Sequence, residues 1–143
     1  MKKALIIGAG GFVGSYLAGC LQNEFGMEVY ATKLPGTQTQ DELLFLGERI
    51  YELDILNKND IVELLFAVRP DYIYHLAAQS SVSVAWKEPA LTIDVNIKGS
   101  VNLMDAVREL YYKPRVLLIG SGEEYGHILE NETPTVSYTH LRA

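Results

Sequence analysis

A glycine-rich turn near the amino terminus is the feature that most restricts how this chain folds. Gly8, Gly11 and Gly14 recur at three-residue intervals, between an apolar run at residues 4–7 and a segment with helical spacing that begins at Phe12. In a strand–turn–helix unit of this kind, the first glycine permits a tight turn and the second lets a pyrophosphate approach the backbone, while the third lets the helix pack against the sheet. The sequence therefore predicts a nucleotide site, with phosphates on the free N–H groups at the start of the helix.

Short apolar runs alternate with helix-like segments along the rest of the chain. The runs that predict strands are residues 4–7, 28–32, 49–53, 71–76 and 116–119. The segments with helical spacing are residues 12–26, 57–70 and 89–112, and loops are expected at 33–48, with one turn near Leu43, and from 77 through Trp86. This alternation predicts an α/β fold, here a Rossmann-type doubly wound parallel sheet that is truncated after about five strands.

Charge and composition exclude several classes of protein. Twelve Lys and Arg against eighteen Asp and Glu give a net charge of −6, whereas a nucleic-acid-binding protein normally carries a basic patch. No apolar run approaches the roughly 18 residues that span a membrane, so no membrane association is expected. Cys20 is the single cysteine, which excludes an internal disulfide and a cysteine-cluster metal site. We expect a cytoplasmic protein without a metal.

The end of the second predicted strand bears on the choice of cofactor. NAD-dependent enzymes usually place an Asp or Glu there to bind the ribose 2′-hydroxyl. This chain has Thr32 and Lys33 instead, and its next carboxylate is Asp41. A hydroxyl followed by a cation suits a 2′-phosphate better, so the sequence favours NADP(H). The alternative is that Lys33 is a solvated loop residue, in which case NAD(H) remains possible.

Five motifs, in order along residues 1–135, resemble those of the extended short-chain dehydrogenases/reductases. They are the glycine turn at residues 8–14, Leu53-Asp54-Ile55, the run from His75 to Ser80, the run from Asp94 to Gly99, and the run from Gly120 to Gly126. The last of these resembles the sugar-nucleotide branch. Within it, the chain is most similar to GDP-4-keto-6-deoxy-mannose reductases and next to GDP-mannose 4,6-dehydratases.

The resemblance implies roles for particular residues. Including Thr32 and Lys33 at the end of the second strand, the residues expected to line the cofactor are Gly8, Gly11, Phe12, Val13, Gly14, Thr32, Lys33, Asp54, Ile55, Leu76, Ala77, Ala78 and Gln79. Asp54 would contact the adenine, and Asn96 would support the architecture of the site. Ser80, Ser121 and Glu123 would contact substrate. Ser121 would hydrogen-bond the reacting hydroxyl or keto oxygen, and Glu123 would act as acid and base on the sugar in a dehydratase.

The proton-exchanging Tyr-x-x-x-Lys motif of the family is absent from the sequence. Tyr138 is followed four residues later by Arg142, but this pair comes too soon after Ser121 for the family pattern, and Arg does not replace Lys conservatively. Residues 136–143 resemble translated library-adapter sequence. We therefore expect residues 1–135 to be the amino-terminal part of a NAD(P)-binding domain, and 136–143 to be a non-native tail.

These observations lead to one favoured function and two alternatives. The favoured function is the cofactor-binding part of an NADP(H)-dependent reductase that passes hydride to a 4-keto-6-deoxy sugar nucleotide, with a GDP-sugar as substrate. A GDP-mannose dehydratase or sugar-nucleotide epimerase is the alternative within the family, and a non-catalytic dinucleotide-binding sensor is the alternative outside it. The resemblance implies that the full-length parent is a homodimer. We expect this chain itself to be inactive and of low stability, and His75 to be a buried, satisfied core histidine.

Overall fold

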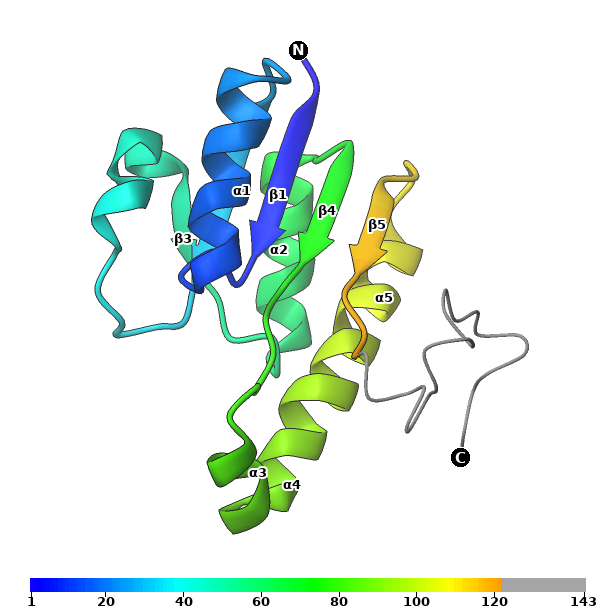
Figure 1. Ribbon diagram of the computed structural model, residues 1–143. Coiled ribbons are helices and arrows are strands. Elements are labelled where there is room, and N and C mark those ends of the chain that lie inside the picture. Colours follow the sequence, from blue (N-terminus) through cyan, green and yellow to red (C-terminus); the bar gives the residue numbers. More distant parts are fainter. Residues whose placement is uncertain (122–143) are drawn as a thin grey trace, which may run out of the picture.

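Five strands form a single parallel sheet in the computed structural model, which describes residues 1–121 (Figure 1). They are β1 (Lys3–Ile7), β2 (Glu28–Lys33), β3 (Ile50–Glu52), β4 (Tyr72–His75) and β5 (Arg115–Leu118). Their order across the sheet is β3-β2-β1-β4-β5, and each neighbouring pair is parallel. This order is that of the first five strands of a doubly wound nucleotide-binding sheet, so the predicted fold class is confirmed.

Helical segments cover both faces of the sheet, because each inner strand is apolar on both sides. They are α1 (Phe12–Asn23), η1 (Asp41–Arg49), α2 (Lys58–Val68), α3 (Val82–Lys87), α4 (Pro89–Ile93), η2 (Asp94–Lys98) and α5 (Gly99–Glu109). Ala4 and Ile6 of β1 pack with α1 and η1, whereas Leu5 and Ile7 pack with α2 and α5. The sheet is thus the middle of three layers (Figure 1). No helix within residues 1–121 is long and apolar enough to cross a membrane.

The helical segments differ from expectation at three places. The loop expected through Trp86 contains the short helix α3, whose first turn is capped by the Ser81 hydroxyl, which accepts a 3.4 Å hydrogen bond from the Val84 N–H. The single turn expected near Leu43 is a longer 3₁₀ segment, η1, which is kinked at Gly47. The predicted helix that starts at Pro89 is interrupted by the π-helical turn η2 before it continues as α5.

Within residues 1–121, the strand β5 lies at one edge of the sheet. Its apolar side chains are not fully covered, since Leu117 and Leu118 are 49% and 44% exposed and the following Ile119 is 59% exposed. An apolar edge strand with this exposure is a template for pairing with another chain.

The stability of the sheet depends on the layer that α2 contributes. Leu65 of α2 is fully buried in the core between α2, α5 and the sheet. We expect Leu65→Ala to lower the free energy of unfolding by about 2–5 kcal/mol, because it removes buried methyl groups and leaves a cavity. Leu44 of η1 is 60% exposed, so Leu44→Ala is the matched control and should change the free energy by less than about 0.5 kcal/mol. Urea unfolding followed by circular dichroism measures both, and equal effects would contradict the described core.

Candidate cofactor-binding site

The glycine turn lies where the strand order of the sheet reverses. The chain moves outward from β1 through β2 to β3, and then crosses back to place β4 on the other side of β1. The carboxyl ends of β1 and β4 therefore diverge toward helices on opposite faces, and ligands of doubly wound sheets bind in the crevice at this point. Figure 1 shows the arrowheads of β1 and β4 side by side at this edge, with the start of α1 next to them.

Two glycines of the turn are required by close approach. Gly8 has a φ of +85°, and a Cβ added there would lie 2.6 Å from the backbone N and Cα atoms of Ala77, in the loop after β4. A Cβ at Gly14 would lie 2.5 Å from Cα of Ala9, so the helix packs tightly on the turn. Gly11 differs, because a Cβ there would meet only the Gly8 carbonyl oxygen, at 3.7 Å. Its outer side is open, as approach of a phosphate to the backbone requires.

The first turn of α1 offers backbone donors at this opening. Gly11 is the N-cap residue and supplies no side-chain cap, so no side chain competes there for the first N–H groups of the helix. Phe12 and Val13, both expected to line the cofactor, occupy this first turn with 79% and 61% of their surface exposed. The helix dipole adds partial positive charge at the same place. The arrangement is suited to a bound anion.

Thr32, at the end of β2, supports the glycine turn from behind. Its hydroxyl oxygen accepts a 3.0 Å hydrogen bond from the Gly8 N–H, and its carbonyl accepts one of 2.8 Å from the Ala9 N–H. Thr32 is only 2% exposed. The hydroxyl predicted to contact a 2′-phosphate is therefore already hydrogen-bonded inside the protein. Gln40, which sequence reasoning missed, braces the other side of the turn by donating from Nε2 to the Gly10 carbonyl at 2.5 Å.

Lys33 follows Thr32 and lies beside the turn. Its ammonium group forms an ion pair with Glu52 of β3 at 3.2 Å and donates a 2.5 Å hydrogen bond to the Thr37 carbonyl. Its side chain is 18% exposed, so Lys33 is not the freely solvated loop residue of the alternative interpretation. The partner Glu52 was not expected, because its carboxylate reaches this place from a neighbouring strand.

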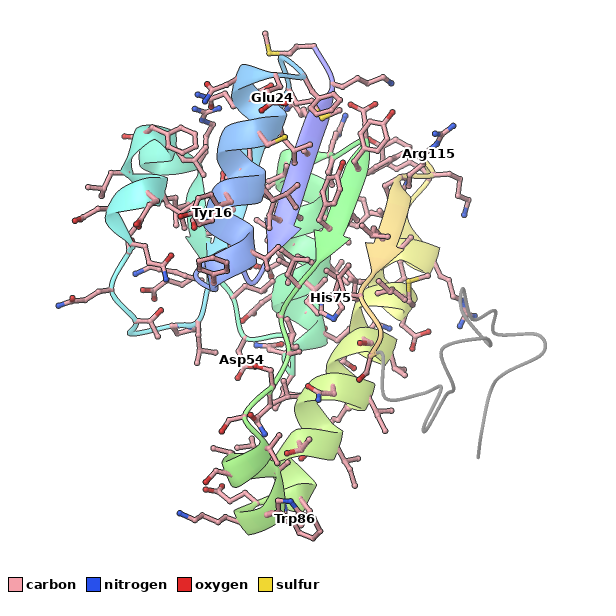
Figure 2. The ribbon with its side chains drawn as sticks, in the orientation of Figure 1. Tyr16, Glu24, Asp54, His75, Trp86 and Arg115 are labelled. Atoms are coloured by element: carbon pink, nitrogen blue, oxygen red, sulfur yellow. The ribbon has the colours of Figure 1, made fainter. Side chains whose placement is uncertain are left out.

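The loop after β3 holds Asp54, which lies at the carboxyl edge of the sheet (Figure 2). The Asp54 carboxylate accepts a 2.9 Å hydrogen bond from the Leu56 N–H, which closes the loop on itself. Asn102 of α5 donates from Nδ2 to the carbonyls of Ile55 and Leu56, at 3.0 and 3.1 Å. Ile55 is 6% exposed, so its side chain belongs to the core, where it packs so closely on Gly99 that a Cβ there would collide with it.

The loop after β4 is held by the helical segment that follows it. The Gln79 N–H donates to Oδ1 of Asn96 at 2.7 Å, and Nδ2 of Asn96 donates to the Gln79 carbonyl at 3.0 Å. The Gln79 side chain in turn donates to the Thr92 hydroxyl at 3.0 Å and accepts from the Ser81 N–H at 2.6 Å. Asn96 thus clamps the backbone at the position where the family resemblance expects a supporting residue.

Of the remaining predicted residues, some lie in the described part of the chain and the others lie outside it. Leu76 and Ala77 are partly buried in the loop after β4, and Ala78 and Ser80 of the same loop are exposed. Ser121 is exposed shortly after β5. Glu123, Tyr138 and Arg142 lie outside the described residues, as does the predicted tail at 136–143.

His75 ends β4 and is 4% exposed, as expected of a core histidine (Figure 2). Its Nε2 lies 3.2 Å from the Ser100 hydroxyl, which donates its own proton to the Asn96 carbonyl. A neutral ring with its proton on Nε2 fits this arrangement, and Nδ1 is buried without a hydrogen-bond partner in the described structure. The prediction that His75 is buried is thus confirmed, but the prediction that its hydrogen bonds are satisfied holds for only one of the two ring nitrogens. Burial lowers the pKa of His75 below its ordinary value of 6.5.

The family model for GDP-mannose 4,6 dehydratase matches residues 5–142. The chain belongs to the GDP-mannose 4,6-dehydratase family. It is 33% identical to the GDP-mannose 4,6-dehydratase of Yersinia enterocolitica, over 91% of this chain and 38% of that protein. It is 29% identical to the GDP-6-deoxy-D-mannose reductase of Pseudomonas aeruginosa, over 93% of this chain and 38% of the relative. The predicted resemblance to extended short-chain dehydrogenases/reductases is confirmed.

Solved structures agree with this assignment. The crystal structure of UDP-glucose 4-epimerase from Brucella ovis in complex with NAD matches with a TM-score of 0.76 and 28% identity. The match covers 89% of this chain and 38% of the epimerase. This member of the GDP-mannose 4,6-dehydratase family therefore spans less than half the length of the relatives it matches.

The buried imidazole makes stability depend on pH. The unfolded chain takes up a proton at His75 near pH 6.5, whereas the folded chain resists it, so the free energy of unfolding falls as the pH drops below about 6.5. We expect a loss of up to about 1.4 kcal/mol per pH unit from this group, and His75→Gln should reduce that slope. Urea unfolding at several pH values between about 5 and 7.5 measures it.

A matched control makes the same kind of substitution at the surface. Trp86 is 85% exposed and does not titrate, so Trp86→Gln should leave the slope close to that of the unmodified protein. The Asp71 carboxyl does not interfere, because Lys2 and the Lys3 N–H hold its pKa below the ordinary 3.8, outside this range. Equal slopes for His75→Gln and the unmodified chain would contradict a buried neutral His75.

Proposed function

We propose that this chain is the cofactor-binding, amino-terminal part of an NADP(H)-dependent enzyme that acts on a nucleotide-linked sugar. The observation that carries the proposal is the glycine turn at the strand-order reversal, where Gly8 and Gly14 are closed by backbone contacts and Gly11 opens outward. The start of α1, which has no side-chain cap, would present its N–H donors to a diphosphate. The proposal places residues 1–135 in this NAD(P)-binding part, and residues 136–143 outside the native sequence.

Each loop at the carboxyl edge has a part in holding the dinucleotide. The turn between β1 and α1 would receive the diphosphate. Asp54, in the loop that Asn102 also holds, would accept a hydrogen bond from the adenine amino group. Lys33 would be the cation nearest to the ribose 2′ position of the adenosine half. The clamped loop from Leu76 to Gln79, which borders the turn at Gly8, would line the nicotinamide side.

The reaction favoured is reduction of a 4-keto-6-deoxy sugar nucleotide, with a GDP-sugar as the substrate class. When bound, the nicotinamide supplies the hydride. Ser80 and Ser121 would contact the sugar, with the Ser121 hydroxyl donating to the keto oxygen. A group that exchanges the proton is still needed, and the sequence lacks the family's Tyr-x-x-x-Lys for that step. The parent protein is proposed to be a cytoplasmic homodimer.

The match to the dehydratase family model supports a second candidate within the same chemistry. A GDP-mannose dehydratase oxidises the sugar at C4, eliminates water and returns the hydride. In that case Glu123 would serve as acid and base on the sugar. An epimerase would use the same cofactor site without net oxidation. All three share the dinucleotide site described above.

The diphosphate contact can be tested by one added methyl group. Gly11 has a φ of −86°, which alanine adopts readily, and the new Cβ would make no close contact with the described protein. We expect Gly11→Ala to leave the melting temperature unchanged while weakening NADPH binding by at least about tenfold, because the methyl group occupies the space of a phosphate. Isothermal titration calorimetry measures the affinity.

Gly19→Ala in the same helix is the matched control. A Cβ at Gly19 would have no neighbour within 4 Å, so this variant should bind NADPH like the unmodified chain. If Gly11→Ala binds as tightly as Gly19→Ala, the diphosphate does not lie on the turn.

The missing proton-exchanging pair leads to a prediction about catalysis. We expect the chain to bind NADPH but not to oxidise it when a GDP-4-keto-6-deoxy sugar is added, because no Tyr-x-x-x-Lys is present to protonate the alkoxide. The absorbance of NADPH at 340 nm, followed over hours, measures this. A longer form of the protein that restores the motif should turn over the substrate. Steady oxidation by the present chain would contradict the assigned role of that motif.

A further inference from the structure

The cation expected to recognise a 2′-phosphate is already neutralised within the protein. Lys33 and Glu52 are directly paired residues of β2 and β3, and both lie at the carboxyl ends of their strands. The Lys33 Nζ atom lies 3.2 Å from a Glu52 carboxylate oxygen and donates to the Thr37 carbonyl. The local charge at this place is therefore close to zero.

The hydroxyl next to Lys33 does not offer a second contact to a 2′-phosphate. Thr32, the neighbouring hydroxyl, is buried and occupied by the Gly8 N–H. Glu52 is 53% exposed, so its carboxylate is open to solvent on the side away from the lysine. The Lys33 side chain begins next to the turn, since a Cβ added at Gly10 would lie 3.9 Å from Cβ of Lys33. The cation is thus close to the ligand region but held by a carboxylate.

We propose that Glu52 determines the cofactor selectivity of this protein by acting through Lys33. A 2′-phosphate carries between one and two negative charges at neutral pH and must draw the ammonium group away from Glu52 before it can pair with it. A ribose 2′-hydroxyl is uncharged, so NAD(H) can bind without breaking the ion pair between Lys33 and Glu52. The ion pair therefore lowers the preference for NADP(H) below that of a free lysine, and Glu52 is a positioning residue that controls where the charge of Lys33 points.

The inference rests on the proposed function, because it concerns the same dinucleotide site. Glu52 and Lys33 lie on β3 and β2, on the opposite side of the sheet from β5 and Ser121, which in the proposed function is the adenosine side. Glu52 and Lys33 should therefore affect only the difference in affinity between NADPH and NADH, which are identical apart from the 2′-phosphate. The ratio of the two dissociation constants is consequently the quantity to measure, since a general loss of folding or of site geometry moves both constants together.

The experiment compares NADPH and NADH binding to the chain by isothermal titration calorimetry at low salt. We expect Glu52→Gln to raise the preference for NADPH by about three- to tenfold, since it removes the competing charge and keeps the side-chain shape. Lys33→Gln should reduce the preference. Glu63→Gln, on the exposed side of α2, changes the net charge equally and should leave the ratio unchanged.

The double variant tests whether Glu52 acts through the lysine. In the Lys33→Gln background, Glu52→Gln should have little effect on the ratio, because no cation is left to release. An equal shift in both backgrounds would overturn the proposal and show that Glu52 repels the phosphate directly. An unchanged ratio for Glu52→Gln, with both cofactors still bound, would also overturn it while leaving the proposed function intact. Failure of the unmodified chain to bind either dinucleotide would overturn the proposed function, and this inference with it.

Discussion

The described structure depends on one backbone contact, the approach of Gly8 to the loop after β4. With a φ of +85° and no room for a Cβ against Ala77, Gly8 lets the loops after β1 and β4 meet without a side chain between them. The pairing of β1 with β4 continues up to this contact, because Ile7 pairs with His75 and the Leu76 N–H donates to the Ile7 carbonyl at 2.9 Å. A larger residue at position 8 would separate the two loops and widen the crevice at the strand-order reversal.

Two asparagines on one continuous helical segment fix the other loops. Asn96, in the π-helical turn η2, makes two hydrogen bonds to the backbone of Gln79, and Asn102, in α5, makes two to the carbonyls after β3. Each side-chain amide thus satisfies backbone groups that no strand or helix pairs, which a loop at a binding site otherwise leaves to water. A π-turn inside a helix is frequently found at a functional site. Here it provides the residue that clamps the loop nearest to the turn, so one rigid element positions two separate parts of the proposed site.

Local sequence patterns predicted the strands, the fold class and the glycine turn, since these depend on periodicity and on residues close together in the chain. The short helix α3 was missed because its six residues are too few to show a helical period. Asn102 was missed because its partners lie 46 and 47 residues earlier in the chain, and no local pattern reports such a contact. Thr32 was assigned to the ligand because it ends a strand at the right edge. The alternation of side chains along β2 turns its hydroxyl toward the Gly8 N–H instead.

The order of the elements also separates the proposed binding residues from the proposed reacting residue along this chain. The turn at Gly8–Gly14, the Lys33–Glu52 pair, Asp54 and the loop clamped by Asn96 all come from the first hundred residues, and α5 completes their support. The first residue proposed to touch the reacting oxygen is Ser121, which follows the edge strand β5. In a parallel sheet every strand end contributes to the same crevice, so the parts of the proposed cofactor site that follow β1, β2, β3 and β4 are brought together within the described residues. The chemistry proposed for Ser121 would therefore take place on the β5 side of the sheet, where Leu117 and Ile119 are exposed.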